Sequence, residues 1–500
     1  MNARWSYGLA TLAGAALVLS FAPFSFPWLA PLCMAVFIAL LRHTDPRTAA
    51  LRSLCFGLGL FAAGTYWLYI SLNVMGGLWP PFAVLLMLCM ILANTAFVTV
   101  VGYVTVRLTP QSGHWYRPVV VFPAVWVVLE WTRGWVLTGF PFLSIGYGQV
   151  ETPLGALAPL TGVYGVSWVT VVIGGLIYAA VRGTLQRRVT VIFAIVALLA
   201  VLQTQNGRNW TVDSGRDFNI GLVQGAVPQQ VKWSAAQLQP TLDLYLRLSL
   251  EMQNRDLIVW PEAAIPALPF EVSDYAALVN EEMTARDTQL FTGILNYDVE
   301  RGEYANTLWA LGAESGLYRK RHLVMFGEYF PLPDFARRWL RIMNLPSENI
   351  APGPRLQEPL LAKGVPVAAT ICWELAFGSE QLDFLPRAQL LVNVSNDAWF
   401  GDTVMPHQHL QIGQMRARET GRFLLRATNS GITAVVNPLG AVVKRIPQFV
   451  PGVLEATVRP YTGATPYVRV GNWPVISLAV LFLLAAVLKL RRQGAQAPRE

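Results

Sequence analysis

Three side chains that could together transfer an acyl group lie far apart in the 500-residue sequence: Glu262, Lys320 and Cys372. A thiol becomes a good nucleophile when a nearby carboxylate accepts its proton. The same carboxyl group can later protonate a leaving group. A fixed ammonium can stabilise the oxyanion, helped by a backbone N–H such as that of Trp373. These residue types indicate acyl transfer through a thioester, provided that the fold brings them together.

Cys372 is the only cysteine of the polar segment 205–470, whereas Cys33, Cys55 and Cys89 lie in apolar segments as small apolar residues. It has no disulfide partner within that segment, and a single cysteine cannot form a cysteine zinc site. Taken alone, a buried core thiol explains Cys372 equally well.

Each member of this set closes or follows an expected strand. Glu262 comes just after the run 256–260, and Cys372 directly follows the run 365–371. Lys320 lies beyond an expected strand at 307–311. Reactive groups in open α/β sheets gather at the carboxyl ends of strands. The alternatives stay open at this point: a carboxylate at a helix N-terminus for the glutamate, and a solvated basic run for the lysine.

The composition indicates that much of the chain lies in a membrane. Hydrophobic residues make up 54% and charged residues only 14% of the sequence, well below the roughly 25% charged residues of soluble proteins. Eight apolar stretches approach the length that crosses a bilayer. They lie at about 8–22, 27–41, 53–72, 81–106, 118–134, 157–181, 188–204 and 472–490.

Lys and Arg occupy only alternate connections between these stretches. They are Arg4; Arg42, Arg47 and Arg52; Arg107 and Arg117; Arg182, Arg187 and Arg188; and Lys489, Arg491, Arg492 and Arg499. The connections 22–27, 73–80 and 135–156 contain neither residue type. This alternation predicts that both termini are cytoplasmic and that the polar block lies on the periplasmic side.

These patterns divide the chain into three parts. Residues 1–204 form a transmembrane domain of about seven helices, 205–470 a periplasmic α/β domain, and 471–500 a final transmembrane helix with a cytoplasmic tail. A cleaved signal peptide is the alternative for the first stretch, but apolar stretches continue after it, so we expect a retained anchor. The net charge of +8 does not indicate a nucleic-acid partner, because the basic residues flank apolar stretches.

The polar block alternates strand and helix patterns, which favours one α/β domain with a largely covered sheet. We expect strands at 220–224, 256–260, 289–295, 307–311, 365–371, 389–394 and 431–436. We expect helices at about 235–253, 273–286 and 406–423.

Other polar residues are interpreted as structural. His407 and His409 are two residues apart and do not share a helix face, so a metal site is not expected. A catalytic histidine beside Cys372 is not expected either, from these two residues or from His322, because the glutamate and the lysine already fill the catalytic roles. We expect Glu130 and Arg133 to neutralise each other at the membrane interface, and Asn393 and Asn396 to hold loops together. Internal ion pairs rather than phosphate binding are expected for arginines on a helical stretch 406–426: Arg416, Arg418, Arg422 and Arg426.

The motifs around the three residues resemble those of a known superfamily. Trp260-Pro261-Glu262, Lys320-Arg321-His322-Leu323 and Ile371-Cys372-Trp373-Glu374 are similar to the Glu-Lys-Cys motifs of the carbon–nitrogen hydrolase (nitrilase) superfamily. The order of membrane stretches, polar domain and final stretch resembles its membrane branch, the apolipoprotein N-acyltransferases. Further similar segments are 224–229 with Lys232-Trp233, 326–331 and 393–401.

The resemblance implies a nitrilase-like α-β-β-α sandwich and a role for each matched residue. Glu262 would be the general base and acid, Lys320 the oxyanion stabiliser and Cys372 the nucleophile. Supporting or substrate-binding residues would be Glu328, Trp373, Glu374 and Trp233. Met325 replaces a frequent proline and Trp373 a frequent tyrosine, which puts pocket details in doubt. Neither a cofactor nor a metal is implied.

The implied reaction has a phospholipid as acyl donor and a diacylated apolipoprotein as acceptor, in the bacterial inner membrane. The amine of an S-diacylglyceryl-cysteine would receive the chain from the thioester, completing lipoprotein maturation. Water must be kept from the thioester, and apolar loops such as Trp339-Leu340 and Leu345-Pro346 could do so. We expect a monomer, because the membrane part would hinder association.

Two other functions use the same residues differently. A membrane-tethered amidase or nitrilase would pass the acyl group to water, but one stretch would suffice as its tether. A transporter or scaffold with an inactive domain would show more intramembrane charges or paired broken helices.

Overall fold

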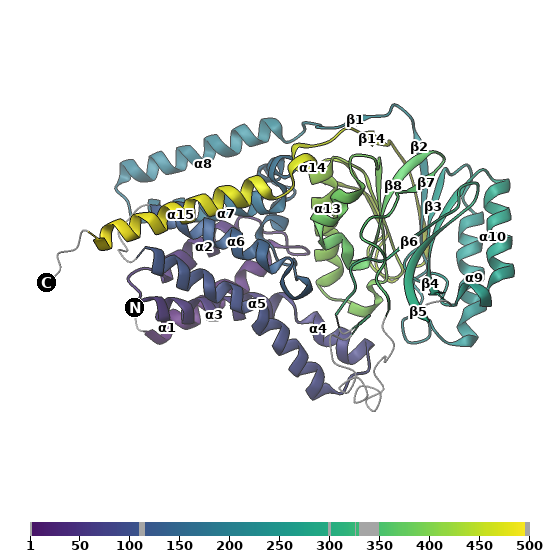
Figure 1. Ribbon diagram of the computed structural model, residues 1–500, viewed down its shortest axis with the longest axis horizontal. Coiled ribbons are helices and arrows are strands. Elements are labelled where there is room, and N and C mark those ends of the chain that lie inside the picture. Colours follow the sequence, from purple (N-terminus) through teal and green to yellow (C-terminus); the bar gives the residue numbers. More distant parts are fainter. Residues whose placement is uncertain (1–2, 110–115, 299–301, 326, 330–349, 496–500) are drawn as a thin grey trace. The chain divides into compact units, whose positions relative to one another are not determined.

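The computed structural model describes residues 3–109, 116–298, 302–325, 327–329 and 350–495. The expected apolar loop residues Trp339-Leu340 and Leu345-Pro346 lie outside the described residues. The chain forms two compact units (Figure 1). Unit 1 comprises 1–69, 79–208 and 469–500, and unit 2 comprises 70–78 and 209–468.

Unit 1 is helical. Its helices are α1 (Ala3–Leu17), α2 (Leu29–Leu40), α3 (Pro46–Gly64), α4 (Trp67–Tyr69), α5 (Pro80–Leu108), α6 (Phe122–Arg133), α7 (Ala158–Val181), α8 (Leu185–Gln205) and α15 (Trp473–Ala495). Asp45 caps α3 by accepting hydrogen bonds from the backbone N–H groups of Arg47 (2.9 Å) and Thr48 (3.1 Å), and Pro46 begins the helix, where no N–H is needed.

Small residues let α1 and α3 approach closely. A Cβ on Gly14 would lie 2.0 Å from the carbonyl oxygen of Phe56, and one on Gly59 would lie 2.0 Å from that of Thr11. Lipid tails are as apolar as the helix surfaces, so the hydrophobic effect does not drive helices together in a membrane. Close packing contacts of this kind drive their association instead. The glycines therefore fit helices that pack together within a membrane.

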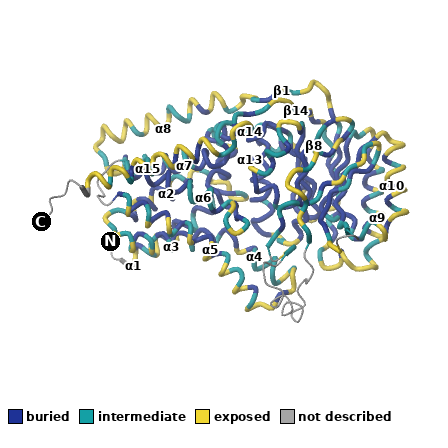
Figure 2. The backbone as a smooth tube through the Cα atoms, in the orientation of Figure 1, coloured by how far each residue is buried: buried dark blue, intermediate teal, exposed yellow. Residues whose placement is uncertain are grey.

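Four helical segments among the described residues are long and apolar enough to cross a membrane, or five if one bent pair counts as a span. They are Pro80–Leu108, Pro153–Val181, Leu185–Gln205 and Trp473–Gln493. The span expected at 53–72 is bent by 50° between Gly64 and Trp67. The 12-residue α2 would extend about 18 Å, which is short of a hydrocarbon core of about 30 Å. Figure 2 shows α8 exposed along most of its length, as for a helix solvated by lipid.

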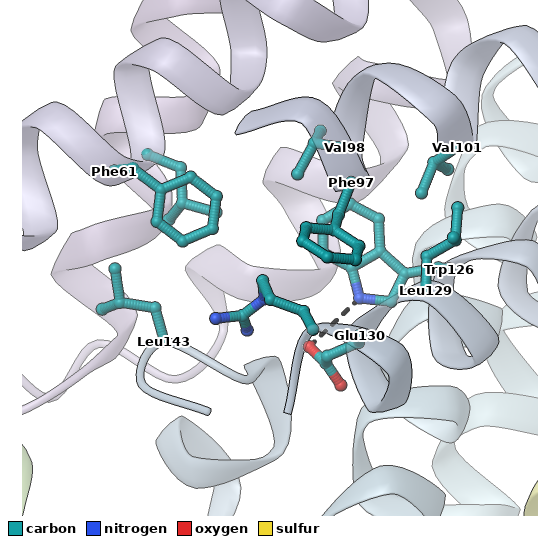
Figure 3. A pocket seen from close by; sticks show the side chains of 10 residues that line it. Phe61, Phe97, Val98, Val101, Trp126, Leu129, Glu130 and Leu143 are labelled. Carbon is teal, nitrogen blue, oxygen red and sulfur yellow. Dashed lines mark hydrogen bonds between the residues drawn. The ribbon is translucent and has the colours of Figure 1, made fainter. Parts of the chain in front are cut away.

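The Glu130 and Arg133 side chains bond to other groups rather than to each other. Glu130 Oε1 accepts from the indole N–H of Trp126 (3.2 Å) and the backbone N–H of Ile145 (2.9 Å). Arg133 donates to the carbonyl oxygens of Phe140 and, at 2.7 Å, Phe142. Both charged residues line a pocket whose other walls are apolar (Figure 3). The two charges attract each other, as expected, and hydrogen bonds also tie both side chains to the segment 140–145.

Unit 2 contains two six-stranded mixed sheets, where the sequence pattern suggested one. The first has the order β13-β2-β3-β4-β5-β6 and the second β12-β11-β10-β9-β8-β7. The first comprises β13 (Gly452–Val458), β2 (Phe218–Gln224), β3 (Leu257–Val259), β4 (Gln289–Asp298), β5 (Glu303–Leu311) and β6 (Gly316–Arg319). The second comprises β12 (Val442–Arg445), β11 (Ala434–Val436), β10 (Leu424–Thr428), β9 (Leu390–Ser395), β8 (Val365–Ile371) and β7 (Leu360–Ala362). A short pair, β1 (Val212–Asp213) and β14 (Tyr461–Thr462), completes the unit.

Helices cover the outer faces of both sheets, so the α-β-β-α sandwich is confirmed (Figure 1). α9 (Ala235–Leu250) and α10 (Ser273–Ala285) pack on the first sheet. Their shared core contains Tyr245, Val279 and Trp260, each at most 1% exposed. α13 (Met405–Thr420) lies on the second sheet and is almost entirely buried. Figure 2 shows the strands between these helices as buried.

Two expected elements differ in ways that move functional side chains. Lys320 follows β6 rather than β5, because Gly316–Arg319 forms a further strand. The helix expected to continue to 426 ends at Thr420, because Gly421 adopts a left-handed conformation (φ 64°) at its C-terminus. The side chain of Arg426 consequently belongs to β10, in the second sheet.

One segment between membrane helices packs with unit 2. The π-helical turn η2 (Ile70–Met75) follows α4 in the chain, yet its contacts are with the segment after β9. A Cβ on Gly401 would lie 3.5 Å from Ile70 and 3.7 Å from Met75, and the Gln230 amide lies 3.6 Å from the Met75 sulfur. Unit 2 is thus built from two separate parts of the sequence.

Gly421→Ala should destabilise unit 2. The left-handed conformation costs a residue with a Cβ roughly 1–2 kcal/mol, and the new Cβ would lie 2.7 Å from Thr211 Oγ1. We expect the melting temperature of the detergent-solubilised protein to fall by several degrees. Gly452→Ala is the control, because a Cβ there meets nothing within 4 Å. Equal melting temperatures for both variants would contradict this account of the helix end.

Candidate active site

The structure brings the predicted carboxylate and ammonium together at the ends of strands. Lys320 Nζ lies 3.4 Å from Glu262 Oε1 and 2.8 Å from Glu328 Oε1. Lys320 is 1% and Glu262 is 8% exposed. Glu262 lies three residues beyond β3, and Lys320 comes directly after β6. Both residues are therefore positioned by the first sheet.

The Glu262 carboxylate has a fixed orientation. Its Oε1 accepts from the Asn306 amide (2.8 Å), and its Oε2 accepts from the backbone N–H of Asn396 (2.8 Å). Asn306 lies on β5, whereas Asn396 follows β9 of the other sheet. The carboxylate thus depends on contacts from both sheets.

The Lys320 ammonium is held by two carboxylates. Burial alone would lower the pKa of Lys320, but Glu328 and Glu262 together raise it well above its usual value. Glu328 is fixed in turn, because its Oε2 accepts from the backbone N–H of Val324 (2.8 Å). The lysine is therefore a permanent cation, suited to stabilising a developing oxyanion.

Cys372 lies at the point where β8 passes into the 3₁₀ turn η8 (Cys372–Ala376). Its φ of 56° is left-handed, which is uncommon for a residue with a side chain. Burial and the Glu262 charge raise the pKa of the Cys372 thiol, and Lys320 opposes them. Because the thiol is neutral at rest, it needs a base to become nucleophilic. The charges that act on it are those of the two predicted partners and of Asp397.

Glu374 ties the lysine segment to the cysteine turn. Its Oε1 accepts from the backbone N–H groups of Arg321 (2.6 Å) and His322 (3.1 Å). Its Oε2 accepts from the N–H of Ile371 (2.7 Å), and the Tyr318 hydroxyl donates to both oxygens. Burial raises the pKa of Glu374. This carboxylate joins residues on both sides of Lys320 to residues on both sides of Cys372.

The two predicted tryptophans lie in different surroundings. Trp373 packs edge-on against His322 and Phe377, with ring centroids 5.4 Å and 5.0 Å apart. Trp233 is 51% exposed in the connection between β2 and α9. An exposed aromatic side chain is available to a substrate, whereas Trp373 forms part of the wall behind the cysteine.

Sequence reasoning missed Lys232 and Asn306 as neighbours of Glu262. Lys232 is 1% exposed, and its ammonium donates to the main-chain oxygen of Glu262 (3.2 Å). Burial lowers the pKa of Lys232 to about 8, with Glu262 opposing the shift. An asparagine within an apolar strand and a lysine before a tryptophan were the available signals. In the described part of the chain, no group of three or more His, Cys, Asp or Glu side chains could hold a metal ion.

Both parts of the sequence match known families. Residues 13–176 match the family described as "Apolipoprotein N-acyltransferase N-terminal domain", and residues 219–467 match "Carbon-nitrogen hydrolase". Together the two matches include the membrane helices as far as α7 and nearly all of unit 2.

Three relatives that match over nearly the whole chain are each named apolipoprotein N-acyltransferase. The chain is 40% identical over 494 residues to apolipoprotein N-acyltransferase of Azotobacter vinelandii, covering 97% of this chain and 96% of the relative. The protein of that name from Methylococcus capsulatus is 38% identical, with 98% of each chain covered. The one from Coxiella burnetii is 37% identical, covering 96% of this chain and 99% of the relative.

Solved structures resemble about half of the chain more distantly. A CN-hydrolase superfamily protein from Xanthomonas campestris is 19% identical with a TM-score of 0.36, covering 49% of this chain and 91% of that one. Saccharomyces cerevisiae Nit3, of the nitrilase superfamily, is 18% identical with a TM-score of 0.37 and the same coverage.

Lys232 should make stability rise with alkaline pH. Its folded pKa of about 8 lies below the ordinary value of 10.5, so the unfolded chain binds more protons between these values. The free energy of unfolding should therefore increase across this window, by roughly 3 kcal/mol at most. In Lys232→Met this rise should be lost, as measured by thermal unfolding of the solubilised protein from pH 7.5 to 10.5.

Lys363→Met is the matched control. Burial alone would lower the pKa of Lys363, but Asp287 and Asp256 together raise it above its ordinary value. The contribution of Lys363 to stability is therefore lost as pH rises. This variant should keep or steepen the alkaline rise. If Lys232→Met retains the wild-type profile, the buried ammonium is not the cause.

Proposed function

The chain belongs to the apolipoprotein N-acyltransferase family, and from this premise we propose that it transfers an acyl chain through a thioester on Cys372. The relatives are 37–40% identical over nearly the whole chain. The protein is accordingly an enzyme of lipoprotein biosynthesis in the bacterial inner membrane, with several membrane-spanning helices. Its acyl donor is a phospholipid and its acceptor is an apolipoprotein.

The observation that supports the catalytic roles is the hydrogen-bonded chain Glu262–Lys320–Glu328 beside a neutral, buried thiol. In the first half-reaction the Glu262 carboxylate takes the thiol proton, and Cys372 Sγ attacks the ester carbonyl carbon of the phospholipid. The Lys320 ammonium and the Trp373 backbone N–H stabilise the oxyanion. The ester C–O bond then breaks, and Glu262 returns the proton to the lysophospholipid.

In the second half-reaction the α-amine of S-diacylglyceryl-cysteine attacks the thioester carbonyl. Glu262 accepts a proton from the amine, the C–S bond breaks, and the proton passes to the departing sulfur. An amide forms, and the thiol and carboxylate return to their starting states. The product is a triacylated lipoprotein.

The supporting residues act on charge and position. When Glu262 becomes protonated, Glu328 still balances the Lys320 ammonium at 2.8 Å, so the cation keeps its place throughout the cycle. Glu374 accepts from the backbone N–H of Arg321 on one side of the lysine and from the hydroxyl of Tyr318 on the other. We assign substrate contact to the exposed side chain of Trp233.

We also propose a periplasmic site, cytoplasmic termini and a monomeric enzyme. The orientation rests on the distribution of Lys and Arg between the apolar stretches. The monomer rests on the membrane part, which would hinder association. A periplasmic acceptor amine could reach a thioester on that side without crossing the membrane.

Incubation of the purified enzyme with phospholipid should add the mass of one acyl chain at Cys372. Hydroxylamine should release the chain, because it cleaves thioesters. Mass spectrometry of the peptide carrying Cys372 measures both steps, and a diacylated lipopeptide should discharge the adduct faster than water does.

Four variants serve this experiment. Glu262→Gln and Lys320→Met should each reduce thioester formation by at least about 10²-fold, whereas Lys363→Met should leave it unchanged. An adduct of the same mass on Cys372→Ser would show that the nucleophile is misassigned. Faster discharge by water than by lipopeptide would indicate a hydrolase.

Impermeant maleimide labelling tests the orientation. In a background with Cys33, Cys55, Cys89 and Cys372 replaced by serine, Gln239→Cys on the exposed side of α9 should react in intact spheroplasts. Arg492→Cys near the C-terminus should react only after permeabilisation. The reverse labelling pattern would overturn the orientation.

A further inference from the structure

A row of polar side chains crosses three parallel strands directly behind the cysteine. Thr370 of β8 is paired in register with Asn393 of β9, and Asn393 with Arg426 of β10. Paired residues of adjacent strands point to the same sheet face. Asn393 and Arg426 are fully buried, so each polar atom in this row needs a partner.

Arg426 determines which atoms of its neighbours can donate. Its Nη1 donates to Asn393 Oδ1, which leaves the Asn393 amide nitrogen as the donor on the opposite side. Its Nη2 lies 3.0 Å from His409 Nδ1, and a guanidinium can only donate. Asp397 Oδ1 also lies 3.3 Å from Nδ1, but the main-chain oxygen of Cys372, 3.2 Å from Nε2, can only accept. The shorter contact with Arg426 and the contact with Cys372 therefore place the ring proton on Nε2. Burial and the Arg426 charge lower the pKa of His409, which keeps the ring neutral.

Asp397 balances this arginine. Its Oδ2 accepts from Arg426 Nη2 at 2.8 Å, and its Oδ1 accepts from the Ser395 hydroxyl at 2.7 Å. Burial alone would raise the pKa of Asp397, but the Arg426 charge lowers it below its usual range. A paired, ionised carboxylate fixes the arginine, and the arginine fixes the two donors.

Both fixed donors reach the main-chain oxygen of Cys372, and the Asn393 amide also donates to the Thr370 hydroxyl at 3.1 Å. Asn393 Nδ2 lies 3.1 Å and His409 Nε2 lies 3.2 Å from the Cys372 oxygen. These bonds hold the peptide unit between Cys372 and Trp373, whose N–H faces the oxyanion in the proposed mechanism. They also restrain the left-handed φ of 56° at the cysteine.

We infer that His409 and Asn393, oriented by Arg426, are positioning residues that hold the Cys372 peptide so that the sulfur and the Trp373 N–H are aligned for acyl transfer. The inference rests on the proposed thioester mechanism and deepens it. It assigns a function to a histidine and an arginine that the sequence patterns indicated were only structural.

Two variants remove one donor each. Asn393→Asp keeps the acceptor for Arg426 but places a second oxygen against the Cys372 carbonyl. His409→Leu removes the ring N–H. Because a displacement of about 1 Å can cost 10²-fold in rate, each should slow single-turnover thioester formation by about that factor, with the KM for phospholipid unchanged. His409→Gln offers an acceptor to Arg426 and an N–H to Cys372, and should restore the rate to within about tenfold of the wild type.

Gln414→Leu is the matched control. Gln414 lies on the same helix, α13, and donates to a main-chain oxygen, that of Gly440 (3.0 Å), away from the cysteine. It should lower the melting temperature as much as His409→Leu does while leaving thioester formation unchanged. The inference is overturned if the control loses acylation equally, if His409→Gln is as slow as His409→Leu, or if Asn393→Asp acylates at the wild-type rate. If His409→Leu does not fold, the rates of thioester formation in Asn393→Asp and His409→Gln, each compared with the wild type, decide the question.

Iodoacetamide alkylation of Cys372 separates this inference from the proposed function. If the wild type forms no thioester, the proposed function fails, and the alkylation rate alone tests the positioning. We then expect at least tenfold slower alkylation in Asn393→Asp than in the wild type or Gln414→Leu. Equal rates would overturn the positioning role.

Discussion

The site depends on the ion pairs that compensate the buried ammonium of Lys320. Removing a charge from water is costly unless opposite charges and hydrogen bonds replace the solvent. Glu262 at 3.4 Å and Glu328 at 2.8 Å provide this replacement, and Asn306 donates to both carboxylates. Removal of either glutamate would leave a buried charge without full compensation. The same electrostatic balance therefore stabilises the fold and holds the catalytic groups in place.

The two-sheet architecture explains why such distant residues meet. Glu262 and Lys320 follow strands of the first sheet, whereas Cys372 and Asn396 follow strands of the second. The hydrogen bond from the Asn396 N–H to Glu262 Oε2 joins these sets. Because neither sheet contains a complete site, the proposed chemistry requires that both have folded and packed together.

The sequence predicted the parts of the site that follow clear strand patterns. Glu262 and Cys372 were recognisable because each comes after a short buried run. The predicted position of Arg426 on a helix was wrong. The helical pattern of the sequence continues through Gly421, although a glycine at that point commonly ends a helix. The contacts of Asn306, Asn393 and His409 depend on which strands become neighbours. That pairing is set by packing across the whole domain, and local patterns do not contain it.

The segment Ile70–Leu78 has a consequence for how the enzyme is divided. It lies in the chain between α3 and α5, yet it packs beside Gln230 and Gly401 as part of the catalytic unit. A fragment cut at Asn209 and Val468 would lack this piece and its contacts with Gln230 and Gly401. Unit 2 therefore cannot be produced complete as one continuous fragment. Insertions between Gly64 and Pro80 would disturb the contacts beside the loop after β9.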